Sequence, residues 1–288
     1  MARSRETARR ISPLETMPVS PFAAQTRGCL AVLSGAILAF LYIPIAFLIL
    51  FSFEQSDTPG LPITGLTTHW YEKMLTDSAI QKAVLNSVEV AVIVAILATI
   101  IGTMAAFPLV RGGIRFAGSA RLLFTMPIMI PGVLIGIGLL IFFRRALDLQ
   151  LSLVTVIAGH LVFTIPFVVL IVAARLQGFD RRLEWAAADL GANGRQTIWH
   201  VVLPLISPAI VAGALLSVTL SIDEFVISYF TIGPQLTLPL YIYTQIKFGV
   251  TPEVNAVATV ILVATLAVFG LGSILLNRGR HLLHRQED

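Results

Sequence analysis

Long apolar segments, separated by shorter polar ones, run through this chain from near its start to near its end. Six of them reach the roughly 20 residues that an α-helix needs to cross a bilayer core of about 30 Å. They span residues 29–53, 83–108, 120–143, 151–174, 206–230 and 254–276. The pattern predicts an all-α, polytopic membrane protein with about six transmembrane helices and with both termini on one side of the membrane.

Residues at the ends of the segments refine this prediction. Ser78 and Gln81 have the spacing of a capping box, so we expect the second helix to begin there. Thr251-Pro252-Glu253 supplies an N-cap, a first-turn proline and a first-turn acid, which predicts the start of the sixth helix. Prolines at or within the spans indicate kinked helices around a cavity, because their freed carbonyls need other partners. These prolines are Pro108, Pro127, Pro131 and Pro166.

Composition supports a membrane protein and narrows its chemistry. Hydrophobic residues make up 56% of the 288 residues and charged residues 12%, with a mean hydropathy of +0.86, far above the usual values of soluble domains. The single cysteine, Cys29, excludes an intramolecular disulfide and a zinc site built on paired cysteines. The basic residues lie mostly beside apolar segments, where they set topology, so we expect no nucleic-acid partner.

The basic residues also orient the chain. With a cytosolic N-terminus, 15 of the 20 Lys and Arg residues fall in inner segments, as the positive-inside rule requires. The first apolar segment is too long for a signal peptide, so we expect it to stay as an uncleaved span. This predicts a cytosolic tail over 1–27, a transmembrane domain over 28–276 with a cytosolic loop at 176–204, and a second cytosolic tail over 277–288.

Motifs for catalysis or cofactor binding do not occur in the sequence. It has no Gly-Lys dipeptide, and so no P-loop for ATP, and neither H-E-x-x-H nor G-x-S-x-G is present. His281 and His284 lie among arginines near the C-terminus, which favours a solvated basic tail over a metal site. The few polar residues within the spans do not form the cluster that an intramembrane enzyme needs. We therefore expect a non-catalytic chain without a metal or cofactor of its own.

Residues 184–204 form a polar segment between two apolar ones in the second half of the chain. Helix formers over 180–190, followed by Gly191, predict a short helix with a glycine stop. Asn193 as N-cap predicts a second short helix, which ends as Leu203-Pro204 leads into the next span. The segment is thus expected to consist of two short helices around a glycine break.

Two interpretations of this segment are open on physical grounds. Ala186, Ala187 and Leu190 are expected to share one face of the first short helix, where small side chains let another helix or a groove approach closely. The segment is then a compact projection into the cytosol. Alternatively, it is an amphipathic connector that lies on the membrane lipid and is anchored by Trp185 and Trp199.

A resemblance to a known family favours the first interpretation. The segment has Ala186-Ala187, then Gly191 four residues after Ala187, and then Leu203-Pro204, whose proline lies thirteen residues after the glycine. This pattern resembles the EAA loop of bacterial ABC-importer permeases. In that family the loop docks into a cleft on the ATPase subunit. The resemblance implies that the ATPase-coupling residues are Glu184, Trp185, Ala186, Ala187, Asp189, Gly191, Arg195, Leu203 and Pro204.

The sequence departs from the family pattern at the glutamate of the loop. Trp185 occupies that position, and the nearest acid, Glu184, lies one residue earlier. Adjacent residues on a helix face different directions. Glu184 therefore replaces the missing glutamate only if the helix rotates by about 100° or the side chain reaches around.

Further segments resemble one branch of this family, the polyamine (spermidine/putrescine) permeases, and within it the second, PotC or PotI type, subunit. The similarity runs from about residue 30 to 276, with motifs at Asn86-Ser87, Leu183–Gly191, Leu220–Phe225, Gly233-Pro234 and Gly249–Ala256. It implies the type I fold of ABC importers, a place in the bacterial inner membrane, and three kinds of partner. These are a cytosolic ATPase dimer that binds ATP and Mg, a second permease chain in a heterodimer, and a periplasmic solute-binding protein.

An acidic pair in the fifth predicted span is the main candidate for substrate contact. Asp223 and Glu224 lie about 16 residues into an apolar helix that starts near Ser207, and an acid at the centre of a span costs about 2.5 to 3.5 kcal/mol. The pair lies in headgroup water, bonds to a neighbouring helix, or lines a path for a cationic amine. Asp223 holds the acid position of the family motif and is the stronger candidate for the path. Tyr229 offers an aromatic surface to an ammonium group, and Glu89 is a further candidate.

The sequence leaves the substrate open. A basic amino acid, an opine-like compound, an aminophosphonate or ferric iron fits the same architecture, and an ion-coupled carrier or channel needs neither an ATPase nor a coupling loop. The second permease chain is a different protein or a second copy of this one. His160, in the fourth span, is expected to hydrogen-bond to a neighbouring helix rather than to carry protons.

Overall fold

The computed structural model describes residues 21–112, 117–247, 249 and 251–284, except for the side chains of 21–27, 117, 268, 269 and 271–284. Apart from one isolated β-bridge between Glu54 and Leu66, every regular element in these residues is helical, which confirms the all-α prediction. The chain divides into two units, Met1–Leu48 and Ile49–Asp288. Of the predicted tails, 1–27 and 277–288, residues 21–27 and 277–284 are helical and the others lie outside the described residues, so the cytosolic placement of both tails stays a prediction.

The first unit contains most of helix α1 (Pro21–Phe51). Gly28–Phe51 is 24 residues long with a mean hydropathy of 2.5, which is enough to cross a bilayer. Its side chains from residue 28 to residue 47 are exposed on every side of the helix. An apolar helix with this exposure fits a hydrocarbon environment, in agreement with the first predicted span.

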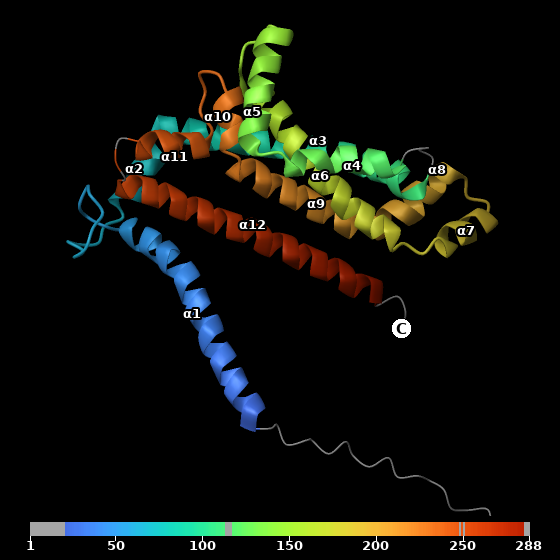
Figure 1. Cartoon of the computed structure of the whole chain (residues 1–288), viewed down its shortest axis with the longest axis horizontal. Helices are drawn as coiled ribbons and strands as arrows, with labels where there is room; N and C mark the ends of the chain where they lie inside the picture. Colours follow the sequence, from blue (N-terminus) through green and yellow to red (C-terminus); the bar gives the residue numbers. More distant parts are fainter. Residues whose placement is uncertain (1–20, 113–116, 248, 250, 285–288) are drawn as a thin grey trace, which may run out of the picture. The chain divides into compact units, whose positions relative to one another are not determined.

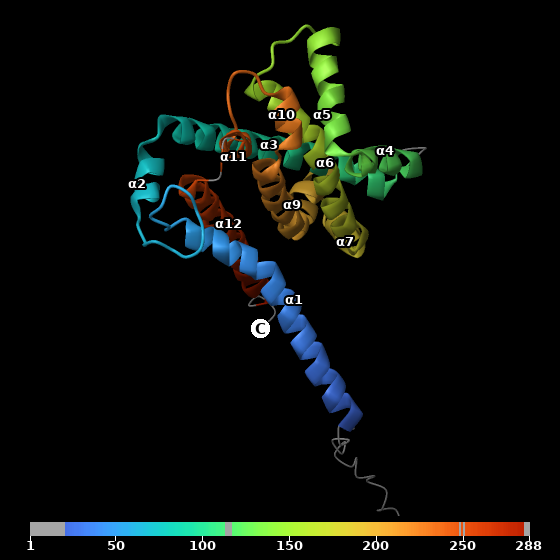
Figure 2. The ribbon, with the colours of Figure 1, turned by 60° about the vertical axis from the view of Figure 1, so that its left-hand side comes forward.

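The second unit contains the remaining helices (Figures 1 and 2). In chain order they are α2 (His69–Thr76), α3 (Ser78–Arg111), α4 (Ala117–Met129), α5 (Gly132–Ile141), α6 (Leu153–Gln177), α7 (Arg182–Asp189), α8 (Gly194–Thr197), α9 (Leu203–Asp223), α10 (Val226–Thr231), α11 (Leu238–Ile246) and α12 (Pro252–His284). Two π-helical turns, η1 (Phe142–Ala146) and η2 (Ile198–Val202), extend α5 and join α8 to α9.

Helices α3, α6 and α9 lie side by side and form the core of this unit (Figure 1). Ala98 of α3, Val168 and Val172 of α6 and Ile206 of α9 are fully buried where the three helices meet. Gly102 of α3 lets α6 approach closely, because a Cβ atom at that position would lie only 2.7 Å from the Cβ atom of Val168. Any larger residue there would force the two helices apart.

Two of the six predicted spans are wrong as single helices. The segment 120–143 consists of α4 and α5, which meet at Pro131 with a bend of 99° and point in different directions in Figure 2. Pro131 explains this break, because it has no N–H to donate and disfavours a helical conformation in the residue before it. The segment 206–230 is broken after Asp223, where α9 ends.

Within the described ranges, the structure contains four or five candidate membrane crossings. Among the described residues, four helices are long and apolar enough to cross a membrane, or five if the bent pair α4–α5 is one span. Helix α12 contributes a shorter apolar stretch, Pro252–Ala267, before the residues whose side chains are not described. Six crossings therefore stay a prediction, whereas the polytopic helical fold is confirmed.

The predicted start of the second helix is right in position but wrong in its cap. Helix α3 begins at Ser78, yet its N-cap is Asp77, whose side chain accepts a hydrogen bond from the Ala79 N–H at 2.7 Å. Gln81 closes no capping box with Ser78, because its Nε2 donates to the Leu75 carbonyl at 2.6 Å. A carboxylate at the N-cap also interacts favourably with the positive end of the helix dipole.

The predicted start of α12 at Pro252 is confirmed. Glu253, in its first turn, accepts a hydrogen bond from Nζ of Lys73 in α2 at 2.6 Å. This bond raises the pKa of Lys73 above its ordinary value. Because the Lys73 side chain is 47% exposed, the pair adds little to overall stability, but it ties α2 to the start of α12.

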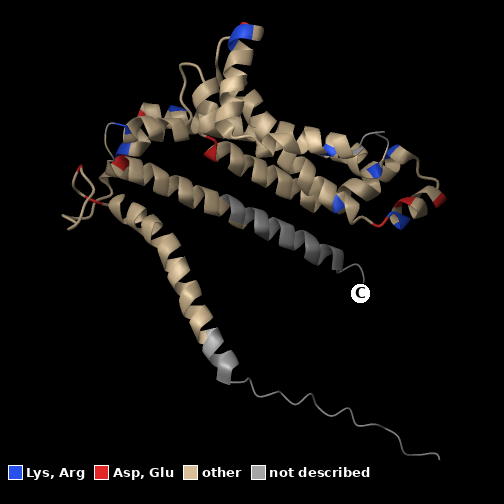
Figure 3. Cartoon of the chain, in the orientation of Figure 1, with Lys and Arg blue, Asp and Glu red and all other residues tan. Residues whose placement is uncertain are grey.

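Charged residues lie mostly near the helix ends of the second unit, whereas the described middles of the helices contain few of them (Figure 3). Basic residues are concentrated around α7 and α8 and at the tip of η1, and an acidic patch lies at the end of α9. Apolar helix middles with charged ends are typical of segments that cross a bilayer.

Candidate functional site

The predicted glycine stop after the first short helix is confirmed. Helix α7 ends at Asp189, and Gly191 adopts a φ of +85°, a conformation that favours glycine. The Gly191 N–H donates to the Ala188 carbonyl at 2.9 Å, and the Ala192 N–H donates to the Ala187 carbonyl at 3.0 Å. These two bonds form a Schellman motif, which satisfies the last carbonyls of α7 and turns the chain sharply into α8.

The predicted cap of the second short helix is also confirmed. The Asn193 side chain accepts from the Gln196 N–H at 2.9 Å, and the Gln196 side chain accepts from the Asn193 N–H at 2.8 Å. The two residues thus form a reciprocal capping box at the start of α8. Arg195, in the same turn, is exposed, as expected.

The prediction that this second helix ends at Leu203-Pro204 is wrong. Helix α8 continues through η2 into α9, so that Gly194–Asp223 is one apolar helical segment of 30 residues. The Leu203 N–H bonds to the Ile198 carbonyl, five residues back, as in a π-helix. This wider turn accommodates the missing N–H of Pro204 without ending the helix.

The side chains of α7 divide into an inward and an outward group. Ala187 is only 9% exposed and faces the protein, so the prediction that it shares an open face with Ala186 and Leu190 is wrong. Four neighbouring residues point outward and define what we call the α7 outer face. They are Trp185, Ala186, Asp189 and Leu190, with Trp185 66% and Leu190 90% exposed. Ala187, in contrast, packs α7 onto its own subunit.

Glu184 is turned away from the α7 outer face. Its two carboxylate oxygens accept hydrogen bonds from both terminal nitrogens of Arg111, at 2.7 Å and 3.0 Å. Arg111 is the last residue of α3, and nothing in the local sequence of either segment predicted this contact across 73 positions. The Glu184 carboxylate is thus engaged within the chain, whereas the Trp185 side chain is exposed.

The acidic pair lies at a break between two helices rather than inside one continuous helix. Helix α9 ends at Asp223, Glu224 is extended with ψ of 99°, and α10 begins at Val226. The Glu224 carboxylate accepts a hydrogen bond from the Ile227 N–H at 2.9 Å and so caps α10. Asp223 is exposed and has no hydrogen bond or ion pair with any described residue. The two acids therefore have different environments, and Asp223 is the one whose charge is available.

His160 holds this break in place from the neighbouring helix α6. Its Nδ1 lies 2.8 Å from Oγ of Ser221 in α9, and its Nε2 lies 2.9 Å from Oγ of Ser228 in α10. The imidazole is 1% exposed, so both ring nitrogens find their partners inside the protein. The prediction that His160 hydrogen-bonds to a neighbouring helix is confirmed, and one side chain clamps both sides of the break.

Replacing His160 by alanine is expected to lower the thermal unfolding midpoint by several degrees. The change leaves a cavity, leaves the Ser221 hydroxyl without its described partner and removes one of the two hydrogen bonds of the Ser228 hydroxyl, at a cost of about 2 to 4 kcal/mol. Ser217→Ala is the matched control, because the buried Ser217 hydroxyl bonds only to the Gly213 carbonyl of its own helix. Equal midpoints for the two detergent-purified variants would show that the clamp contributes nothing.

An aromatic cluster lies beside the break. Phe225 stands with its ring centroid 4.8 Å from that of Tyr243 and 5.8 Å from that of Tyr229, and Tyr229 contacts Phe230 at 5.2 Å. Tyr229 is 49% and Tyr243 38% exposed, so both offer open ring surface. The Nζ of Lys247 lies 6.0 Å from the Tyr243 ring centroid, an ammonium group already on an aromatic face. The sequence analysis identified only Tyr229 of this cluster. The other aromatic residues lie within apolar segments or in a separate segment of the chain, so nothing in the sequence linked them to the acidic pair.

Other candidate residues do not join this cluster. Glu89 lies exposed on α3 and forms no hydrogen bond or ion pair with any described residue. In the part of the chain that the structure describes, no group of three or more His, Cys, Asp or Glu residues is placed to hold a metal ion. The side chains of His281 and His284 lie outside the described residues.

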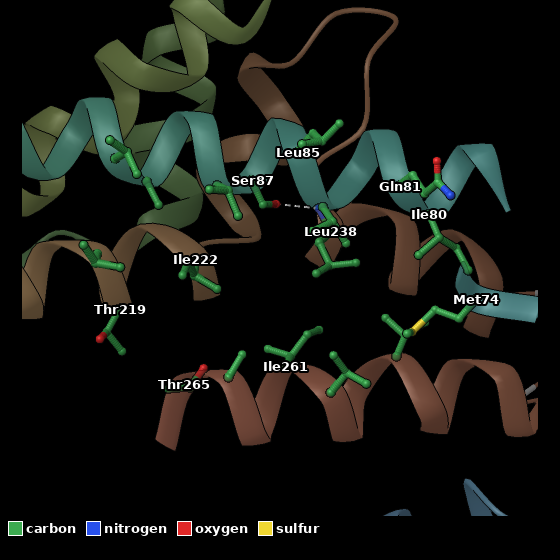
Figure 4. A pocket seen from close by; sticks show the side chains of 18 of the residues that line it. Met74, Ile80, Gln81, Leu85, Ser87, Thr219, Ile222, Leu238, Ile261 and Thr265 are labelled. Atoms are coloured by element: carbon green, nitrogen blue, oxygen red, sulfur yellow. Dashed lines mark hydrogen bonds between the residues drawn. The ribbon is translucent and has the colours of Figure 1, made fainter. Parts of the chain in front are cut away.

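A cavity of about 710 Å³ in the second unit is not the polar path (Figure 4). It is lined by α3, α9, α12 and neighbouring segments through residues such as Leu85, Ile222 and Ile261. Only a few neutral polar side chains, among them Gln81 and Ser87, reach it, and no charged one does. A hydrocarbon lining of this kind binds no charged solute, so the candidate site for a cation remains Asp223 with the aromatic cluster.

Comparisons with known proteins agree with this architecture. Residues 98–285 match the family described as "Binding-protein-dependent transport system inner membrane component". The spermidine/putrescine transport system permease protein PotC of Escherichia coli K12 is 42% identical over 237 residues, covering 81% of this chain and 88% of that protein. The putrescine transport system permease protein PotI of the same organism is 39% identical over 231 residues, covering 77% and 82%.

Solved structures share the fold at low sequence identity. A chain of a bacterial ABC transporter involved in the import of the acidic polysaccharide alginate has a TM-score of 0.70 and 18% identity, covering 88% of this chain and 96% of that chain. A chain of the MetNI methionine ABC transporter has a TM-score of 0.60 and 19% identity, covering 72% and 98%. The fold is thus that of ABC importer permeases. The chain belongs to the family of binding-protein-dependent transport system inner membrane components, as a multi-pass, non-catalytic permease subunit.

Proposed function

We propose that this chain is the membrane subunit of an ATP-driven importer for polyamines, such as spermidine and putrescine, or related cationic amines. The observation that carries the proposal is the carboxylate of Asp223, which is exposed, forms no hydrogen bond or ion pair with any described residue, and lies two residues before Phe225 of the aromatic cluster with Tyr229 and Tyr243. The names of the two permease relatives support the same class of substrate.

The chemistry of this site suits an organic ammonium ion. A carboxylate attracts the charge of the ammonium group, and an aromatic face binds the charge and the adjoining methylene groups together. Glu224 contributes less to such a site, because its carboxylate already caps α10. Asp223 therefore carries the charge contact in this proposal, and Tyr229 and Tyr243 supply the surface along which the chain of the amine moves.

The energy for transport comes from outside this chain. In our proposal a cytosolic ATPase dimer, which binds ATP and Mg, docks on the α7 outer face, and a second permease chain completes a heterodimer. A periplasmic solute-binding protein delivers the amine, and both termini lie in the cytosol. ATP binding shifts the permease between two conformations because the ATPase dimer has a different affinity for each of them.

Reconstitution tests this function directly. Vesicles that contain the permease pair and the ATPase are expected to accumulate labelled spermidine or putrescine only when ATP and the loaded binding protein are both present. Uptake that needs neither would indicate a channel or an ion-coupled carrier. A panel that also holds basic amino acids, an aminophosphonate and ferric iron identifies the substrate, because the binding protein is expected to be stabilised against heat by the solute that it delivers.

A further inference from the structure

The inner end of α3 is bonded to α7 through one pair of side chains. Arg111 is the last residue of α3, and Gly112, with a φ of +72°, ends the helix after it. Both terminal nitrogens of Arg111 donate to Glu184 in the first turn of α7, at 3.0 Å and 2.7 Å. A two-point contact of this kind fixes the angle between the two groups as well as their distance.

Aromatic rings hold the same guanidinium from other sides. Its central carbon lies 5.1 Å from the ring centroid of Phe107, one turn earlier on α3. It lies 6.0 Å from the ring centroid of Phe179, in the segment between α6 and α7. Arg111 thus contacts α3, α7 and the connection that leads into α7, and it forms part of the wall of a small cavity of about 280 Å³ at this junction.

Partial burial strengthens this contact relative to an ordinary surface ion pair. The side chains of Arg111 and Glu184 are 23% and 22% exposed, whereas those of Lys73 and Glu253 in the other ion pair described are 47% and 12% exposed. Reduced solvent contact weakens the screening of the charges, and the stacked rings limit the rotamers of Arg111. Trp185, the next residue of α7, points outward and takes no part in the junction.

We propose that Glu184 is a positioning residue, which acts on the ATPase only through Arg111. The ion pair joins α7 to the inner end of α3, so that a displacement of the α7 outer face moves α3 with it. The ATPase itself touches Trp185 and its outward neighbours, not Glu184. This inference rests on the proposed function, because it concerns how a force from the docked ATPase enters the membrane helices.

Three variants of the full complex test the proposal. Glu184→Gln and Arg111→Gln are expected to leave co-purification of the ATPase within about twofold of wild type, but to reduce hydrolysis stimulated by the loaded binding protein by about tenfold, a typical coupling between two sites. The reversed pair, R111E with E184R, is expected to restore at least half of the lost stimulation. Arg121→Gln removes an exposed arginine of α4 that has no described partner and serves as the control for charge loss.

A distance measurement detects the junction without relying on activity. Spin labels at Met104→Cys on α3 and Ala188→Cys on α7, both exposed positions, are introduced in a Cys29→Ser background and measured by pulsed electron paramagnetic resonance. Glu184→Gln is expected to broaden the distance distribution, and the reversed pair to narrow it again. An unchanged distribution in Glu184→Gln would overturn the proposal.

The outcomes separate this inference from the proposed function. If Glu184→Gln releases the ATPase and the reversed pair fails to restore binding, Glu184 contacts the ATPase itself. The inference about Glu184 would then be wrong, whereas the proposed importer function would be unaffected. If the wild-type complex neither retains an ATPase nor requires ATP for uptake, the proposed function is wrong. The distance measurement still decides whether α3 and α7 are joined.

Discussion

Asp223→Asn is expected to reduce polyamine uptake by about tenfold or more, the loss typical of removing a charge from a hydrogen bond to an ammonium group. Asparagine keeps the size and shape of the side chain but not its charge. Since Asp223 bonds to no other described residue, the change removes no internal contact and should leave folding intact. Uptake of labelled spermidine and putrescine, normalised to the amount of permease in the membrane, measures the effect.

Glu224→Gln is the matched control for this experiment. Its amide oxygen still accepts from the Ile227 N–H, so α10 keeps its cap while the neighbouring negative charge is lost. We expect a much smaller loss of uptake than in Asp223→Asn. Equal uptake in Asp223→Asn and wild type would refute the role of Asp223. A severe loss in Glu224→Gln alone would assign the path to the other acid.

Gly191→Asp is expected to uncouple the permease from its ATPase. A φ of +85° strains a residue with a Cβ atom by about 1 kcal/mol, and a negative charge at the C-terminal end of α7 opposes the helix dipole. The turn between α7 and α8 would shift, and with it the α7 outer face. Loss of ATPase co-purification and of hydrolysis stimulated by the loaded binding protein measures the effect.

Gly191→Asn separates the two causes in this variant. Asparagine tolerates a left-handed backbone better than most residues and carries no charge. We therefore expect it to retain most of the coupling that Gly191→Asp loses. If the ATPase still co-purifies with Gly191→Asp and its hydrolysis is still stimulated, the turn is not part of the docking element.

Local signals predicted much of this fold because they act over a few residues. The Gly191 stop and the Asn193 N-cap were visible from the local sequence alone, and both are present. Pro131 was among the prolines expected to kink a span, but the full break there and the break after Asp223 were missed, for a different reason. The runs around Pro131 and Glu224 are apolar on both sides, so hydropathy alone continues across them. The helix is interrupted at Pro131 because proline has no N–H to donate. It is interrupted after Asp223 because the Glu224 carboxylate caps the next helix, α10.

The contacts that complete the site depend on tertiary structure and could not be read from the sequence. Arg111 and Glu184 are 73 positions apart, and each alone looks like an ordinary charge at the end of a span. His160 gave a better signal, because a polar side chain inside an apolar segment needs a partner. Its partners, Ser221 and Ser228, could not be identified, since small hydroxyl residues are common in such helices.

The unbroken helical segment from Gly194 to Asp223 joins the turn after α7 to the acidic pair through one continuous helix. Its 30 residues extend over about 45 Å at about 1.5 Å per residue. One end of this rod lies directly after the Gly191 turn, and the other end carries the exposed carboxylate. A tilt of about 10° about the α8 end would swing Asp223 through about 8 Å by simple geometry. A continuous helix of this length can thus convert a small rotation at its α8 end into a displacement large enough to expose or withdraw a charged side chain at its other end.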